Sequence, residues 1–271
     1  MADKMLRTIV LLVLALSAAP QAGAVDSQVL KRIEGEVCWK VDSEAGVDLI
    51  VAELGDAGQK AFREIAAQRT QSAFLRACAL HWLYRTPAEH QMVKKIARDE
   101  TEPGVVRSFA LMWFGVPVED EDAEVFAQAL RSKDCDVVGT ALDSIAMLSS
   151  ELLRSLARDQ VTSVLASRSY PDGCVLRFVA AAGRLGARGA VPSLREIGLS
   201  ASEDERSSVT EALCEIGGPE GLAASGEVYR AMTHAGMKEL THGRLAKCTT
   251  RLKERGENAE ALKEFTDALA R

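Results

Sequence analysis

The sequence contains few aromatic residues and little proline. Phe, Trp and Tyr make up 5% of the 271 residues, and there are 7 prolines. So few aromatic side chains disfavour a sugar-binding groove or a base-stacking platform. Basic residues are not in excess either, because 33 Lys and Arg stand against 39 Asp and Glu. A nucleic-acid binder would carry a basic footprint, so a net charge of −6 argues against that class.

Catalytic and metal-binding motifs are missing as well. The sequence has no G-x-S-x-G, no S-x-x-K, no P-loop, no C-x-x-C and no H-E-x-x-H. The acidic run at 119–122 lacks the glycine and the closing Glu of a Ca²⁺ loop, and we interpret it as a capped, solvated loop. We therefore predict a non-enzymatic protein with no catalytic residue, no metal site and no cofactor.

The first 24 residues are typical of a secretory signal peptide. Lys4 and Arg7 precede an apolar stretch at 9–19, and a small-x-small cleavage site follows, ending at Ala24. This stretch is shorter than the ~20 apolar residues that span a bilayer. No later stretch is long and apolar enough to do so. We therefore predict an exported protein, periplasmic or secreted, without a membrane span, whose single mature domain covers residues 25–271.

Hydrophobic residues make up 47% of the full sequence. The mature chain is predicted to be helical. Apolar residues recur at i, i+3, i+4 and i+7, and alternating strand patterns are nearly absent. The stretch 175–185 is one such helix. Gly186 suits the left-handed residue at its C-terminus, and Pro192 falls in the first turn of the next helix.

This helix pair repeats along the chain. The apolar residue that ends each first helix recurs at intervals of 29 to 37 residues, at Leu54, Leu83, Phe114, Leu148, Leu185, Ile216 and Leu252. A small residue stands four positions earlier at Ala79, Ala110, Ala181 and Ala212. A period of 30–40 residues with two helices per unit is typical of an α-solenoid. The predicted fold class is all-α, with about seven helix pairs.

The predicted helices follow from this register. First helices are expected near 45–54, 70–84, 103–115, 135–148, 174–185, 203–216 and 237–254. Second helices are expected near 57–68, 88–99, 121–131, 151–168, 189–199, 219–232 and 257–270. Residues 28–40 are predicted to form an extra N-terminal capping helix.

The stretch Leu176–Leu194 resembles a HEAT repeat of the short bacterial type. It has Ala, then Leu-Gly, a small-residue turn and Val-Pro-x-Leu in that order, and parts of the pattern recur at 106–115 and 209–217. The resemblance covers residues 45–233. It implies an α-superhelix that mainly holds other proteins, with the second helices lining its concave side. HEAT-like folds also include some enzymes.

Six cysteines in an exported chain favour disulfides. Equivalent positions in adjacent repeats are spatial neighbours, which predicts the pairs Cys135–Cys174 and Cys214–Cys248. Cys38 and Cys78 remain by elimination, although the register does not make them neighbours. The alternative is that the cysteines are unpaired and pack as small hydrophobic residues.

The predicted second helices carry basic residues, namely Arg63, Lys95, Arg98, Arg154, Arg158 and Arg195. Acidic residues are interleaved with them, so one interpretation is a solvated, salt-bridged face. The other is a shallow basic stripe that binds an acidic peptide. We predict an exported HEAT-repeat scaffold that binds a protein or peptide on its concave face. The alternatives are a structural subunit of an envelope assembly, or an exported enzyme or chaperone-like factor on the same scaffold.

Overall fold

The computed structural model describes residues 27–38, 44–83, 87–112 and 122–269. Every regular element in these ranges is a helix, and no strand occurs in them, which confirms the all-α prediction. None of the described helices is long and apolar enough to cross a membrane. The predicted signal peptide at 1–24 lies outside these ranges. The chain divides into two units, residues 1–90 and 91–271.

The described residues of unit 1 form five helical elements before the boundary region. They are α2 (Ser27–Arg32), which continues as the π-helix η1 (Ile33–Cys38), then α3 (Glu44–Ala67), α4 (Ala73–Leu83) and the 3₁₀ turn η2 (Pro87–Glu89). The two helices predicted at 45–54 and 57–68 together make up α3. They meet at a kink at Gly55, where the backbone is not helical, with φ 50° and ψ −137°. Glycine adopts this backbone conformation without the steric penalty of a side chain.

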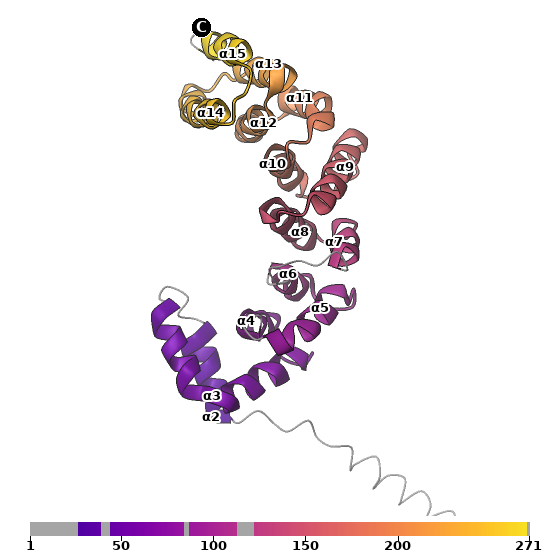
Figure 1. Cartoon of the computed structure of the whole chain (residues 1–271), viewed down its shortest axis with the longest axis vertical. Coiled ribbons are helices and arrows are strands. Elements are labelled where there is room, and N and C mark those ends of the chain that lie inside the picture. The colour runs from indigo at the N-terminus through magenta and orange to yellow at the C-terminus, as the bar shows by residue number, and fades with distance from the viewer. Residues whose placement is uncertain (1–26, 39–43, 84–86, 113–121, 270–271) are drawn as a thin grey trace, which may run out of the picture. The chain divides into compact units, whose positions relative to one another are not determined.

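Unit 2 begins within α5 and continues as paired helices (Figure 1). Its elements are α5 (His90–Arg98), α6 (Gly104–Met112), α7 (Ala123–Leu130), α8 (Cys135–Met147), α9 (Glu151–Ser167), α10 (Val175–Leu185), η4 (Arg188–Ala190), α11 (Val191–Ser200), α12 (Glu203–Ile216), α13 (Gly218–Arg230), α14 (Ala235–Glu254) and α15 (Ala259–Leu269). These bounds agree with the predicted helices to within a few residues.

The helices of unit 2 form two rows. In the first-helix row, α6, α8, α10, α12 and α14 contact one another in that order, and in the second-helix row α7, α9, α11, α13 and α15 do the same. The two rows pack against each other, for example α9 against α10 and α12 against α13. In Figure 1 the first-helix row lies on the inner side of the bend of unit 2, and the second-helix row lies on the outer side. The expectation that second helices line the concave side is therefore wrong for this unit.

Small residues bring neighbouring helices of the first-helix row close together. The predicted small-residue positions Ala110, Ala181 and Ala212 are at most 2% exposed. A Cβ atom on Gly183 would lie 3.0 Å from the Cα of Ala212, so α10 and α12 approach at backbone contact. Leu185, with Ile216 and Leu252 of the later repeats, is buried at the end of its helix.

Helix ends follow the signals in the sequence. Gly186 ends α10 in the left-handed conformation, with φ 66° and ψ 43°, and Pro192 lies in the first turn of α11. Ser202 and Glu205 form a reciprocal capping box at the start of α12. These local interactions fix where each helix starts and stops.

Arginine side chains cap the carbonyl ends of preceding helices in both units. In unit 1, Arg76 Nε donates to the carbonyl oxygen of Ala66 at 3.0 Å. In unit 2, the buried Arg107 donates in the same way to Ala97 at 3.4 Å. The last carbonyls of a helix have no partner within it, so a guanidinium from the next helix satisfies them. The same role is taken later by Arg206.

Candidate functional site

Two cysteine pairs connect neighbouring helices of the first-helix row. Cys135 at the start of α8 bonds to Cys174 at the N-cap of α10, with Cα atoms 5.4 Å apart. Cys214 of α12 bonds to Cys248 of α14, with Cα atoms 6.4 Å apart. These are the pairs that the repeat spacing predicted, and both Cα distances are in the range that a disulfide requires.

The third predicted pair is only partly described. Cys78 is half-buried on α4, and the side chain of Cys38 lies outside the described residues. Among the cysteines that the structure describes, none is free.

Most of the predicted partner-binding residues are engaged within the protein. Arg63 pairs with Glu89 in unit 1, and Arg158 pairs with Glu151 on its own helix. Arg154 Nη1 donates to the carbonyl oxygen of Ala146 at 3.0 Å and so caps α8.

Arg195 makes the most complete of these interactions. Its Nε and Nη2 donate to the two carboxylate oxygens of Glu227, each at 2.6 Å. This hydrogen bond raises the pKa of Arg195, and it lowers the pKa of Glu227. Of the six predicted residues, Lys95 and Arg98 on α5 are exposed, with no ion pair to a described residue. The second helices therefore carry a mainly salt-bridged face, which is the first of the two interpretations.

The acidic run at 119–122 also differs from the prediction where it is described. Asp122 is 1% exposed, and its carboxylate lies 2.7 Å from Lys94 Nζ. It makes no side-chain cap to α7. The interpretation as a capped, solvated residue is wrong for Asp122, because burial beside a lysine replaces solvation. The other residues of the run lie outside the described ranges.

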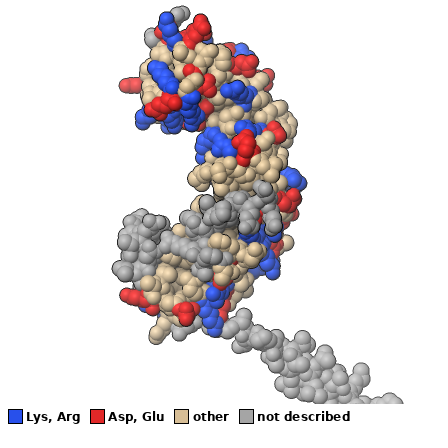
Figure 2. Space-filling model, viewed as in Figure 1, with Lys and Arg blue, Asp and Glu red and all other residues tan. Residues whose placement is uncertain are grey.

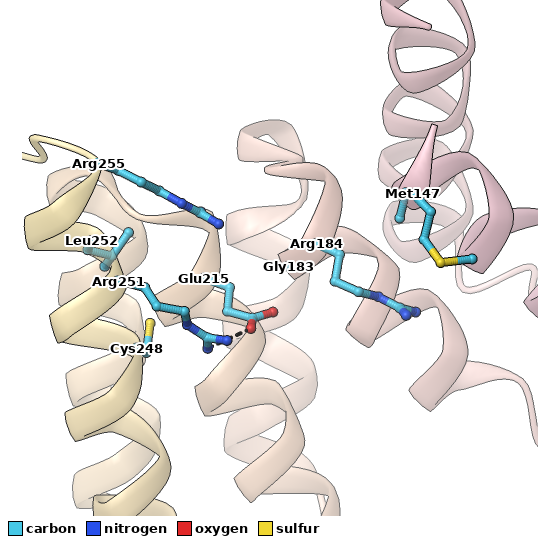
Figure 3. A pocket seen from close by; sticks show the side chains of 9 residues that line it. Met147, Gly183, Arg184, Glu215, Cys248, Arg251, Leu252 and Arg255 are labelled. Atoms are coloured by element: carbon cyan, nitrogen blue, oxygen red, sulfur yellow. Dashed lines mark hydrogen bonds and ion pairs between the residues drawn. The ribbon is translucent and has the colours of Figure 1, made fainter. Parts of the chain in front are cut away.

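A groove on the first-helix row gathers the charged residues that the sequence analysis did not select. Its volume is about 240 Å³, and α8, α10, α12 and α14 supply its walls (Figure 3). We call it the Glu215 groove. It is lined by Ala146, Met147, Gly183, Arg184, Glu215, Cys248, Arg251, Leu252 and Arg255. A second depression of about 540 Å³ on α8, α10 and α12 shares Arg184 and Glu215 with it.

The groove residues occupy one position of the repeat. Met147, Arg184, Glu215 and Arg251 each stand directly before the apolar residue that ends their first helix. The residues four and seven positions earlier also lie on this face of α10 and α12, because that spacing keeps them on one side of a helix. This register was present in the sequence and could have identified the groove.

Ion pairs across this face join α8 to α10 and α12 to α14. Asp143 of α8 pairs with Arg184 of α10, and its other oxygen lies 3.5 Å from Arg177. Glu211 and Glu215 of α12 pair with Arg244 and Arg251 of α14, at 3.4 and 2.9 Å respectively. Acidic residues thus lie on α8 and α12, and basic residues lie on α10 and α14.

This face is positively charged although the whole chain is acidic. We call it the inner charged face; it consists of the cations Arg177, Arg184, Arg244, Lys247, Arg251 and Arg255 and the carboxylates Asp143, Glu211 and Glu215. Lys247 and Arg255 have no ion-pair partner within the described ranges. In Figure 2, Lys and Arg side chains gather around α14, with acidic side chains beside them. The Glu215 groove itself is lined by three arginines and one carboxylate, which leaves an excess of positive charge there.

Glu215 is the most enclosed carboxylate of the inner charged face. Its side chain is 23% exposed, and a Cβ atom on Gly183 would lie 2.8 Å from its Oε2. Burial raises the pKa of the Glu215 carboxyl above its ordinary value, and attraction to Arg251 opposes this only in part. Figure 3 shows Arg255 extending from the end of α14 toward α12.

The described histidines have structural contacts. His234 Nδ1 accepts a hydrogen bond from the Met237 N–H at 3.2 Å and caps α14, and His242 Nδ1 lies 3.3 Å from the Tyr229 hydroxyl. In the part of the chain that the structure describes, no group of three His, Cys, Asp or Glu residues is arranged to hold a metal ion.

Comparison with known proteins adds no family or relative. No family model matches the sequence, and no curated protein matches it.

Proposed function

We propose that this protein is an exported HEAT-like α-solenoid that binds an acidic segment of a partner protein on the inner charged face of unit 2. Three observations support the solenoid. The helices pair at the predicted repeat spacing, successive pairs stack in two rows, and arginine caps recur at helix ends. Stacked helix pairs of this kind leave a long inner surface that is not needed to close a core.

The observation that carries the binding proposal is the excess of cations on the inner charged face. Lys247 on α14 and Arg255 at its C-cap are exposed, each four residues away from the paired Arg251 and on the same side of the helix. A local positive field on an acidic protein attracts acidic segments of a partner. The second helices offer less, because Arg154, Arg158 and Arg195 are engaged with carboxylates and carbonyls.

Export is part of the proposal and has separate support. The cysteine pairs between neighbouring helices suit an oxidising compartment, where disulfides persist. The predicted signal peptide supplies the route.

The test measures binding of an acetylated, amidated oligoglutamate peptide to the mature protein by fluorescence anisotropy. Arg244→Gln with Lys247→Gln removes two cations from the inner charged face. The matched control, Arg98→Gln with Arg158→Gln, removes two cations from second helices. We expect the first variant to lose affinity and salt dependence, and the control to bind like the unaltered protein.

Two results would contradict the proposal. Equal loss in the two variants would mean that only net charge matters, and loss in the control alone would place binding on the second helices. Circular dichroism of both variants confirms that the helices are retained.

A further inference from the structure

The inner charged face contains a carboxylate at the point where an acidic ligand would bind. Glu215 accepts a hydrogen bond from Arg251 Nη2 at 2.9 Å inside the Glu215 groove. An incoming carboxylate needs the same guanidinium, since Arg251 is one of the three cations that line this cavity. Glu215 is therefore in the position of an internal ligand for Arg251.

The surroundings of Glu215 contain more positive than negative charge. Arg184 faces it from α10, Arg251 and Arg255 face it from α14, and Glu211 lies one turn earlier on α12 itself. Arg184 is also paired with Asp143 of α8. The nearest described histidine on α14, His242, contacts Tyr229 of α13 instead.

Packing closes one side of the Glu215 carboxylate. Helices α10 and α12 approach so closely there that a Cβ atom on Gly183 would lie 2.8 Å from Glu215 Oε2. A second negative charge beside Arg251 would therefore lie within a few ångströms of the Glu215 carboxylate. Two carboxylates at such a distance repel each other, which favours proton uptake by one of them.

We propose that Glu215 regulates the groove by competing with the ligand for Arg251. When a side-chain carboxylate of an acidic segment binds between Arg251 and Arg255, Glu215 takes up one proton from solvent and releases the guanidinium. The groove therefore binds acidic segments more tightly at mildly acidic pH than at neutral pH. This inference rests on the proposed function and specifies its regulation.

The direction of the pH dependence follows from the order of titration. Burial raises the pKa of Glu215, so this group protonates at a higher pH than the exposed carboxylates of a ligand, which titrate near pH ~4.3. As the pH falls from neutral, Glu215 is neutralised first and affinity rises. Affinity falls again only when the ligand carboxylates themselves become protonated.

The experiment uses the same acetylated, amidated oligoglutamate peptide and measures its Kd from neutral pH down to about pH 5, where the peptide is still mostly ionised. We expect Glu215→Gln to bind about tenfold more tightly at neutral pH, because one competing charge is removed beside the site. Its affinity should also lose most of the pH dependence seen in the unaltered protein. Calorimetry in buffers of different ionisation enthalpy should show proton uptake on binding, and this uptake should be absent in the variant.

Glu196→Gln is the matched control. Glu196 is an ion-paired carboxylate of α11, 3.5 Å from Arg168, and does not belong to the inner charged face. This variant should keep both the pH dependence and the proton uptake. If Glu196→Gln and Glu215→Gln behave alike, the effect is a general surface charge effect and the inference is wrong.

The outcomes separate this inference from the proposed function. If the unaltered protein binds the peptide, but Glu215→Gln keeps the same pH dependence and proton uptake, only the regulatory role is refuted. If the unaltered protein and Glu215→Gln both fail to bind at any pH, the proposed function is refuted. Thermal unfolding of each variant shows whether the groove remains folded.

Discussion

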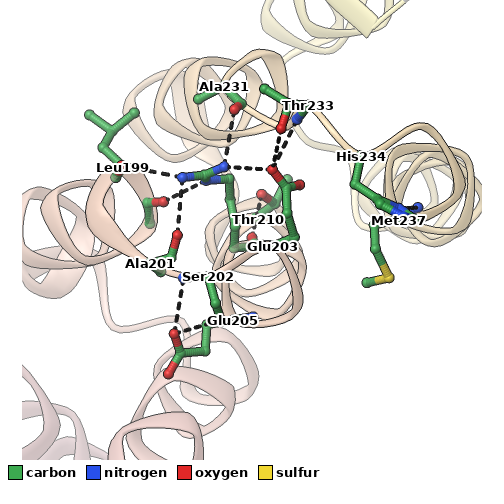
Figure 4. A network of polar contacts seen from close by, with 12 residues as sticks. Leu199, Ala201, Ser202, Glu203, Glu205, Thr210, Ala231, Thr233, His234 and Met237 are labelled. Atoms are coloured by element: carbon green, nitrogen blue, oxygen red, sulfur yellow. Dashed lines mark hydrogen bonds and ion pairs between the residues drawn. The ribbon is translucent and has the colours of Figure 1, made fainter.

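Replacing Arg206 by lysine is expected to destabilise unit 2 strongly. The guanidinium of Arg206 connects the ends of two helices to the start of a third. Figure 4 shows the partners Leu199, Ala201, Ala231 and Glu203 in this network. It donates to the carbonyl oxygens of Gly198 at 3.0 Å, Leu199 at 3.4 Å, Ala201 at 3.0 Å and Ala231 at 3.1 Å. It also pairs with Glu203 at 3.0 Å, and its side chain is 13% exposed.

The magnitude follows from the number of bonds that lysine cannot make. A hydrogen bond from a charged donor contributes about 1.5–3 kcal/mol net. Lysine keeps the charge beside Glu203 but presents a single nitrogen, so several carbonyls lose their donor. Water replaces part of this loss at the accessible carbonyls. We therefore expect the free energy of unfolding to fall by about 2–4 kcal/mol, a large fraction of the ~5–15 kcal/mol of a typical domain.

Urea unfolding followed by far-ultraviolet circular dichroism measures this change. Arg188→Lys is the control, because Arg188 is exposed on η4, and a surface substitution of this kind should change stability by less than ~0.5 kcal/mol. A loss below about 1 kcal/mol for Arg206→Lys would refute the reasoning, because it would mean that the helix-end carbonyls do not depend on the guanidinium.

Four further predictions concern other parts of the chain. Reducing the two disulfides, which close loops of 39 and 34 residues, should lower the thermal midpoint, since each contributes about 4 kcal/mol by chain entropy; an unchanged midpoint would contradict this. Gly183→Ala should lower the free energy of unfolding in urea by about 1–3 kcal/mol through overpacking. Gly243→Ala should be neutral or stabilising, because its Cβ atom would have nothing within 4 Å. Equal effects of the two substitutions would refute the close approach of α10 and α12. Because folding lowers the pKa of Glu227, this carboxylate should stabilise the protein at every pH above its pKa in the unfolded chain. The stability difference between the unaltered protein and Glu227→Gln should therefore disappear as the pH falls through the lowered pKa. A difference that stays constant with pH would contradict this prediction. N-terminal sequencing of exported protein should begin within two residues of Val25, and a chain that keeps Met1 would exclude cleavage.

The helices and their ends were predictable because their causes are local. Apolar spacing defined the buried side of each helix, and Gly186 and the Ser202–Glu205 capping box marked helix termini within a few residues of chain. The same repeat register brought Cys135 to Cys174, because equivalent positions of stacked units are neighbours whatever the details of packing. The sequence predicts a helix boundary between 54 and 57, and α3 has its kink there, at Gly55. A glycine that kinks a helix and one that ends it look alike in sequence, so the pattern does not tell a kink from a turn.

The charged site depended on the tertiary structure. The sequence places Arg195 and Arg251 equally well on exposed helix faces. Only the packed helices show that each pairs with a carboxylate of a neighbouring helix in its row. Arg195 pairs with Glu227, and Arg251 pairs with Glu215. Whether a charge is neutralised, buried or left in solvent depends on groups 30 or more residues away and on the side toward which the rows bend. Asp122, predicted to be solvated, is buried beside Lys94 for the same reason. Hydrophobic periodicity and caps act within one or two helical turns, whereas electrostatic environment is set by distances in space.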